Sequence, residues 1–169
     1  MKFELDCFLV LSKDLEDADL SDLIERSGDL LERGAPRGRG ARIEKFSIES
    51  RNLNLRIVSG RYVRPHDAVF RIKKFLAREI GRKYKVGIRQ VFAQRYVVKF
   101  ELEREPKKPV KVPFAHLEFK GKKCSVIFEN LDEEFLRKNY VDRIITVSYT
   151  HLRAHETSLH IVCRLLLEK

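Results

Sequence analysis

The sequence has few cysteines and lacks the long apolar run that a membrane-spanning helix needs. Its three cysteines stand at unrelated spacings, which excludes a disulfide framework and favours a reducing cytoplasm. No stretch of about 18 apolar residues is present, so no segment is predicted to cross a bilayer. The N-terminal residues MKFELDCFLVLSKDLED carry acids where a signal peptide needs an unbroken apolar run, and export is therefore not expected.

The sequence also lacks a recognisable set of catalytic residues. His66 and His116 have no nucleophile or metal ligand near them in sequence, and Cys7 and Cys124 stand in an apolar alternation that is typical of buried thiols. The segment GAPRGRG at 34–40 has neither the residue order nor the strand-to-helix setting of a phosphate-binding loop. We therefore interpret it as the end of a helix followed by a loop.

Positive charge is abundant and unevenly distributed. The chain of 169 residues has a formal net charge of +10. Residues 14–32 contain eight acids and one base, whereas residues 61–99 contain twelve lysines or arginines against two acids. A surplus concentrated in this way exceeds what solubility requires and indicates a polyanionic partner.

Alternating hydrophobic patterns predict several strands. Apolar residues alternate with polar ones over residues 2–11, as in a strand that is buried on one side. Similar alternation predicts further strands over about 42–48, 52–58, 86–92 and 95–103, and a hairpin that turns near Gly121.

Three segments have the residue spacing of helices. Residues 14–33 are acid-rich at their start, where the helix dipole favours negative charge, and Gly34 follows them. A second helix is predicted over about 65–82 and a third after Asn130, which forms a capping-box pattern with Glu133. Strands that adjoin strands, with helices interspersed, favour an α+β fold: an antiparallel sheet of about six strands capped by about three helices.

The second predicted helix has two opposite faces. One is an apolar stripe formed by Val69, Ile72, Leu76 and Ile80. The other lies roughly 200° around the helix axis and is here called the cationic ridge: Arg71, Lys74, Arg78 and Arg82. A solvated helix face would show the same pattern, but the scarcity of balancing acids favours phosphate binding. The full predicted RNA-binding set is Arg61, Arg64, Arg71, Lys74, Arg78, Arg82, Lys83, Lys85 and Arg89.

Four motifs in this order carry a family resemblance: RGAPRGRGARI, SGRYVRPHDAVFRIKKFLAREIGRKYKVGIR, KVPF and YVDRIIT. They resemble the N-terminal tRNA-binding domain of the methanogen-type (archaeal, type 2) seryl-tRNA synthetase. The resemblance covers about residues 1–146 and is densest from Ser59 to Arg89. It implies an antiparallel sheet capped by helices that binds tRNA with a long variable arm through shape and phosphate contacts.

Specific positions of the family also match. In the family, basic positions of the second helix and of the following strand face the tRNA, and the matching residues here are Arg71, Lys74 and Arg89. The chain departs from the family pattern at Arg37, where an acid is frequent, and at Gln90, where glycine is frequent.

The resemblance further implies that the parent protein is an ATP-dependent class II serine–tRNA ligase whose catalytic domain follows later in the chain. ATP, magnesium and zinc would belong to that domain, so the present residues are expected to hold no cofactor and to catalyse no reaction. The expected partners are serine-accepting tRNA and the catalytic domain of the same natural chain, with no membrane and with homodimerisation of the parent left open. The expected location is the cytoplasm.

The last residues, 147–169, contain His151, His155, His160 and Cys163, which invites a metal-site interpretation. Their sequence instead resembles a translated adapter from transposon-based sequencing libraries. VSYTHLRAHET matches that translation throughout, and IVCRLLLEK differs from the adjoining flow-cell sequence only at Ile161. We therefore predict a natural tRNA-binding domain over 1–146 and an adapter-encoded tail over 147–169, and we assign no metal site.

Two alternatives remain open on the sequence alone. The chain could be a stand-alone basic RNA-binding protein with no ligase attached. It could also be a protein-interaction module whose basic helix docks on an acidic partner, such as the acidic first helix of a second copy.

Overall fold

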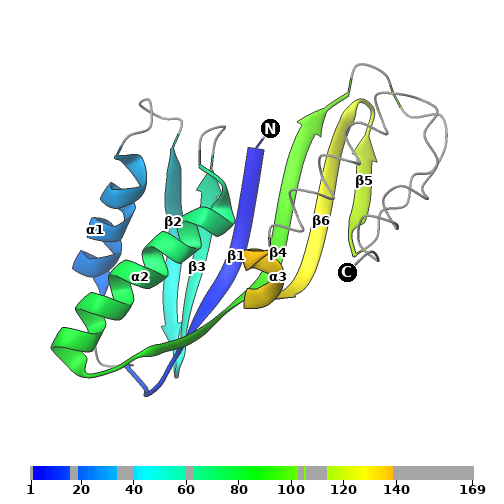
Figure 1. The fold of residues 1–169 in the computed structure, drawn as a ribbon. Coiled ribbons are helices and arrows are strands. Elements are labelled where there is room, and N and C mark those ends of the chain that lie inside the picture. Colours follow the sequence, from blue (N-terminus) through cyan, green and yellow to red (C-terminus); the bar gives the residue numbers. More distant parts are fainter. Residues whose placement is uncertain are drawn as a thin grey trace.

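Within the ranges that the structure describes, six strands form one sheet with the order β2-β3-β1-β4-β6-β5, and three helices accompany it (Figure 1). The computed structural model describes residues 2–15, 19–33, 40–59, 63–102, 105 and 114–138. All neighbouring strands pair antiparallel, which confirms the predicted α+β class. The elements are β1 (Lys2–Leu11), α1 (Ser21–Glu32), β2 (Ala41–Glu49), β3 (Asn52–Ser59), α2 (Pro65–Tyr84), β4 (Ile88–Glu101), β5 (His116–Lys120), β6 (Lys123–Asp132) and α3 (Glu133–Arg137).

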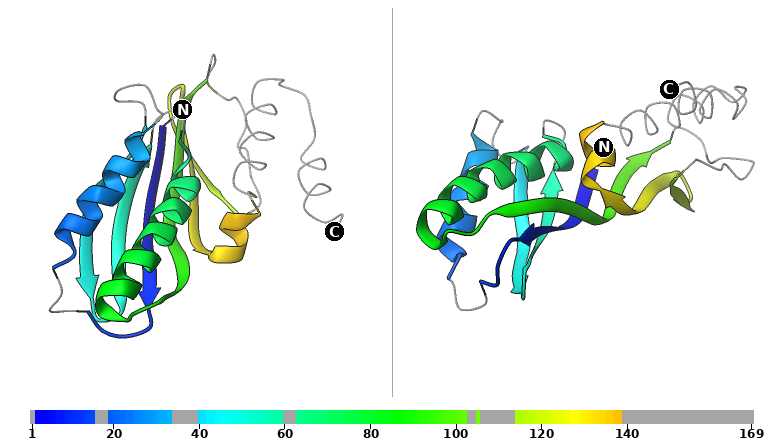
Figure 2. Two further views of the ribbon diagram at one scale, coloured as in Figure 1. Left: turned by 60° about the vertical axis from the view of Figure 1, so that its left-hand side comes forward. Right: turned by 60° about the horizontal axis from the view of Figure 1, so that its bottom comes forward.

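The helices of the described ranges lie on one face of the sheet, and none of them lies on the other face, here called the open face (Figure 2). On the central strand β1, Leu5, Cys7 and Leu9 are buried beneath the helices. Because successive side chains of a strand point to opposite faces, Glu4 and Asp6 lie on the open face. Helix α1 packs beside β2, α2 packs over β1 and β3, and α3 contacts β4 and β6. No helix in the described ranges is long and apolar enough to cross a membrane.

Strand β4 is continuous, so the prediction of two separate strands over 86–92 and 95–103 is wrong. Asp6 pairs with Arg95 and Cys7 pairs with Ala93, which leaves Gln94 as an extra residue opposite β1. Such a β-bulge shifts the alternation of apolar and polar residues by one position. In the sequence, this shift resembles the end of one strand and the start of another.

Helix α1 begins at Ser21, later than the predicted start at residue 14. The side chain of Asp19 accepts a hydrogen bond from the Ser21 backbone N–H, with an O···N distance of 2.9 Å. Asp and Ser favour positions beside the first turn of a helix, because their side chains bind backbone groups that have no partner within the helix. The Asp19–Ser21 contact marks such a boundary, so α1 starts after Asp19.

Helix α3 is capped by Asp132, whose Oδ1 accepts a hydrogen bond from the Phe135 backbone N–H at 2.8 Å. The predicted cap, Asn130, lies instead in β6 with a φ of 55°. Strand β6 therefore continues two residues further than expected before the helix starts. The later helical positions that the sequence predicts, from residue 140 onward, lie outside the described residues.

Candidate nucleic-acid interface

Helix α2 presents its apolar stripe to the sheet. Val69, Ile72, Leu76 and Ile80 each expose 1% of their surface or less, and the helix packs over β1 and β3. Burial of a large aliphatic side chain stabilises a fold by about 1.5–3 kcal/mol. Four such side chains in one line fix the rotation of α2 about its own axis, as predicted from their spacing.

Contacts with α1 hold one flank of α2. The guanidinium carbons of Arg26 and Arg78 lie 5.4 and 5.7 Å from the centroid of the Phe75 ring, within the range of cation–π attraction. Arg26, which belongs to α1, also reaches Glu79 with an Nη2–Oε2 distance of 3.9 Å. These contacts keep α1 beside α2.

Contacts with α3 hold the other flank. The Lys73 ammonium donates a hydrogen bond to Glu133 Oε1 at 2.7 Å, and the Val91 backbone N–H of β4 donates one to Glu133 Oε2 at 2.9 Å. The guanidinium of Arg137 lies 4.8 Å from the centroid of the Phe70 ring and also donates to Glu133. Burial acts to raise the pKa of Glu133, but the hydrogen bonds from Lys73, Arg137 and Val91 hold it below its ordinary value.

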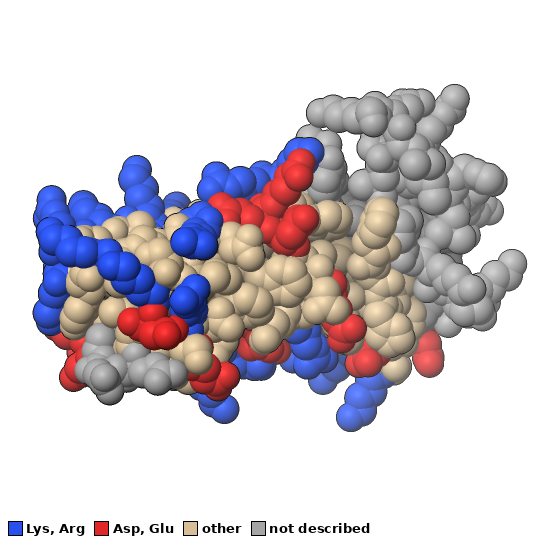
Figure 3. Space-filling view, turned by 90° about the horizontal axis from the view of Figure 1, so that it is seen from below, with Lys and Arg blue, Asp and Glu red and all other residues tan. Residues whose placement is uncertain are grey.

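The cationic ridge occupies the remaining side of α2, away from the sheet. All four of its side chains are exposed. Arg78 donates a hydrogen bond to Glu79 at 3.0 Å, whereas no carboxylate in the described part of the chain pairs with Arg71, Lys74 or Arg82. Figure 3 shows lysine and arginine side chains gathered at the end of the molecule formed by α2 and the start of β4. The ridge is therefore neither folded inward nor neutralised as a whole.

The other predicted cations surround the ridge. Arg64 precedes α2, Lys83 and Lys85 stand at its C-terminal end, and Arg89 lies at the start of β4; all four are exposed. Arg61 lies outside the described residues. The structure confirms the expected exposure of these side chains, while their contact with RNA stays a prediction.

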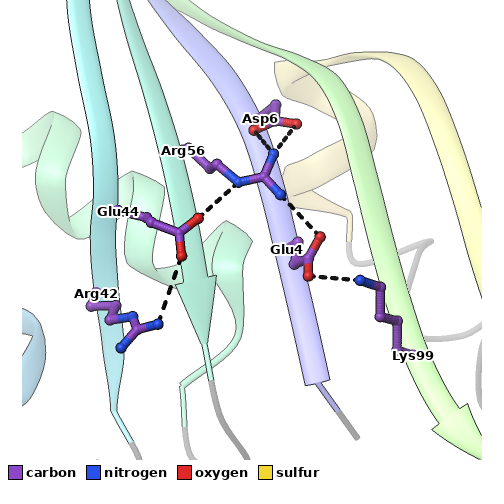
Figure 4. A network of polar contacts seen from close by, with 6 residues as sticks. All are labelled: Glu4, Asp6, Arg42, Glu44, Arg56 and Lys99. Carbon is purple, nitrogen blue, oxygen red and sulfur yellow. Dashed lines mark hydrogen bonds and ion pairs between the residues drawn. The ribbon is translucent and has the colours of Figure 1, made fainter.

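The centre of the open face has a different electrostatic character, because the charges there are paired with one another (Figure 4). Arg56 donates hydrogen bonds to Asp6 at 2.9 Å, to Glu44 at 2.9 Å and to Glu4 at 3.2 Å. The hydrogen bond from Lys99 to Glu4, 2.8 Å long, is the main reason that the pKa of Glu4 lies below its ordinary value. A phosphate would find no unbalanced cation at the centre of this network.

Sequence reasoning missed Lys73 and Glu133 as parts of this region. Glu133 was expected to complete a capping box, and Lys73 is one of two adjacent lysines of which only Lys74 points to solvent. Lys73 and Val91 lie far from Glu133 in sequence, so no local pattern could have indicated these contacts.

The sheet is antiparallel and has helices on one face, and the outward side of α2 is cationic. These features define a class: a small α+β domain with a polycationic surface. A family model described as a tRNA-binding domain matches residues 1–150. The chain belongs to this tRNA-binding domain family, which confirms the resemblance read from its motifs.

Type-2 serine–tRNA ligases of archaea are among its relatives. The chain is 34% identical to that of Methanococcus maripaludis (strain C6), over 98% of the chain and 34% of the relative. It is 42% identical to that of Methanothrix thermoacetophila over 62% of the chain and 22% of the relative. In the crystal structure of A. aeolicus tRNASec in complex with M. kandleri SerRS, the synthetase is similar with a TM-score of 0.81 and 31% identity, over 94% of this chain and 32% of that one. The match thus spans between about a fifth and a third of the length of these relatives.

The family model ends at residue 150, close to the domain boundary predicted at residue 146. The alignment over 98% of the chain extends into residues 147–169. These residues lie outside the described ranges. The adapter origin of the tail therefore stays a prediction, which the nucleotide sequence of the natural gene would test.

Proposed function

We propose that this domain binds tRNA through the cationic ridge of α2 together with Arg89 at the start of β4. The observation that carries the proposal is the exposed line of arginine and lysine side chains opposite the buried stripe, largely without carboxylate partners in the described residues. Each cation that neutralises a phosphate releases counterions, which favours binding. The paired charges at the centre of the open face offer no comparable line of cations.

Recognition is proposed to rest on the shape of the tRNA and on its phosphates. A helix side chain cannot enter the deep, narrow major groove of A-form RNA, so a row of cations on a helix suits the backbone better than the bases. Membership in the tRNA-binding domain family and the similarity to a synthetase in complex with tRNASec support RNA as the ligand. A long variable arm is the proposed shape feature.

We further propose that the natural chain is a cytoplasmic serine–tRNA ligase in which this domain positions tRNA for a separate catalytic domain. The length of the relatives supports a larger parent. ATP, magnesium and zinc, and any homodimer contacts, are assigned to that larger protein. The genomic reading frame beyond codon 146 tests this: a frame that stops there without a class II catalytic domain would contradict the ligase assignment and favour a stand-alone RNA-binding protein.

Replacing Arg71, Lys74 and Arg89 together by alanine is the test of the binding surface. The salt dependence of tRNA affinity should become less steep by up to about 3 units if each side chain contacts one phosphate. The measurement is a titration of the 169-residue chain with a long-arm tRNA at several salt concentrations, repeated with a tRNA that lacks the arm.

A matched control removes three exposed cations of the open face: Lys45, Lys120 and Lys123. The control changes the net charge by the same amount. The ridge variant should therefore bind tRNA more weakly than the control only if the ridge contacts RNA. Equal losses from both variants would show that net charge alone drives binding. Equal affinity of the unmodified chain for both tRNAs would defeat the shape specificity.

A further inference from the structure

Glu133 lies where three elements meet. It is the first residue of α3, directly after β6, and its side chain is 18% exposed. One carboxylate oxygen accepts hydrogen bonds from Lys73 of α2 and from Arg137, and the other accepts from the Val91 backbone N–H of β4. Each oxygen of the carboxylate thus binds a different element, α2 on one side and β4 on the other.

The two elements that Glu133 joins carry the two parts of the proposed RNA surface. Lys73 lies between Arg71 and Lys74 in sequence, on the flank of α2 that faces α3. Val91 is two residues beyond Arg89, which corresponds to about 7 Å along a strand. The bridge through Glu133 therefore ties the flank of α2 beside Arg71 and Lys74 to the part of β4 that follows Arg89.

We propose that Glu133 is a positioning residue of the RNA-binding surface: its carboxylate sets the spacing between the cationic ridge and Arg89. The proposal rests on the proposed tRNA-binding function. Phosphates along an RNA backbone have a limited range of spacings, and cations held in a matching arrangement bind them with less ordering cost than mobile ones. Glu133 supplies that order without contacting RNA itself.

Electrostatic repulsion alone predicts the opposite effect of Glu133 on tRNA affinity. Glu133 is a carboxylate close to a phosphate-binding surface, so removing its charge should strengthen RNA binding if charge were its only contribution. A positioning residue has the reverse signature, because its loss weakens binding although it removes no phosphate-contacting cation. The salt dependence of affinity, which counts phosphate contacts, should then stay unchanged.

The experiment is a tRNA titration of the 169-residue chain carrying Glu133→Gln, across several salt concentrations. We expect affinity to fall by about three- to tenfold at fixed salt, with an unchanged salt slope. The matched control is Glu134→Gln. Glu134 is the next residue of α3 and pairs with Lys138 at 2.6 Å, with 71% of its side chain exposed. That variant removes the same charge and should bind as well as the unmodified chain or slightly better.

A second variant, Lys73→Met, keeps the inference testable through a double-mutant cycle. If Glu133 and Lys73 act as one bridge, Glu133→Gln should add little to the loss caused by Lys73→Met. Amide exchange at Val91 should also accelerate in Glu133→Gln while the melting temperature shows that the fold is retained. Unchanged or tighter tRNA binding by Glu133→Gln, with the unmodified chain binding well, would overturn the positioning role alone. Failure of the unmodified chain to bind tRNA would instead refute the proposed function.

Discussion

At the scale of the single residue, Lys85 is held in a conformation that suits another amino acid better. It ends α2 with a φ of 57° and a ψ of 35°, in the left-handed region that glycine adopts without steric cost. Lys85→Gly should therefore raise the free energy of unfolding by about 0.5–1 kcal/mol. It should also weaken tRNA binding and reduce the salt slope by about 1 if the ammonium contacts a phosphate. Thermal melting and salt-series titration measure the two effects.

The neighbouring cation provides the control for Lys85. Lys83→Ala removes one charge from the last turn of α2 without any relief of backbone strain, and stability should change by no more than about 0.5 kcal/mol. If Lys85→Gly gained stability and kept full affinity, its charge would have no part in binding. A gain in stability together with a loss of tRNA affinity would instead explain why a non-glycine residue occupies this position.

At the scale of the element, one face of α2 contributes to the stability of the fold, and the opposite face carries the proposed RNA-binding side chains. Leu76 is fully buried in the core, whereas Lys74 is exposed one half-turn away. Leu76→Ala should destabilise the fold by about 2–5 kcal/mol, since it removes methyl groups and leaves a cavity. Lys74→Ala should leave stability nearly unchanged and flatten the salt dependence of tRNA binding. Chemical denaturation of both variants checks this: a large loss of stability from Lys74→Ala would show that the ridge is structural.

The same element shows how far sequence reasoning reaches. The two faces of α2 were predicted from residue spacing alone, because the helical period determines which side chains lie on the same side of a helix. The period of two likewise predicted β1. The period of two gave the wrong prediction at the Gln94 bulge, because an extra residue in a continuous strand resembles a strand end. The contacts of Glu133 could not be predicted from the sequence, because its partners Lys73 and Val91 come from distant segments. Local pattern thus predicts elements and faces, while contacts between elements require the fold.

At the scale of the whole molecule, most of the acids of α1 face away from the ridge. Asp22, Glu25, Asp29 and Glu32 are exposed along one side of α1. The last three of them line a groove beside β2, with a volume of about 470 Å³. Arg26 stands on the side of α1 that faces α2 and contacts Phe75 and Glu79 there. Asp22 pairs with Arg26 at 3.7 Å and so lies next to this side, whereas Glu25, Asp29 and Glu32 turn toward the groove beside β2.

This separation predicts an electrostatic boundary that depends on salt. Replacing Glu25, Asp29 and Glu32 of α1 by their amides should strengthen tRNA binding at about 0.01 M ionic strength, where the Debye length is roughly 30 Å and the acids still repel the RNA. The gain should shrink at about 0.15 M, where that length is about 8 Å and charges that face away from the ridge are largely screened. Titrations at both ionic strengths measure the effect, with Glu101, Glu118 and Glu129 of the open face as a control set. A gain that persisted at the higher salt would place RNA in direct contact with α1, and the binding surface would then extend across both helices.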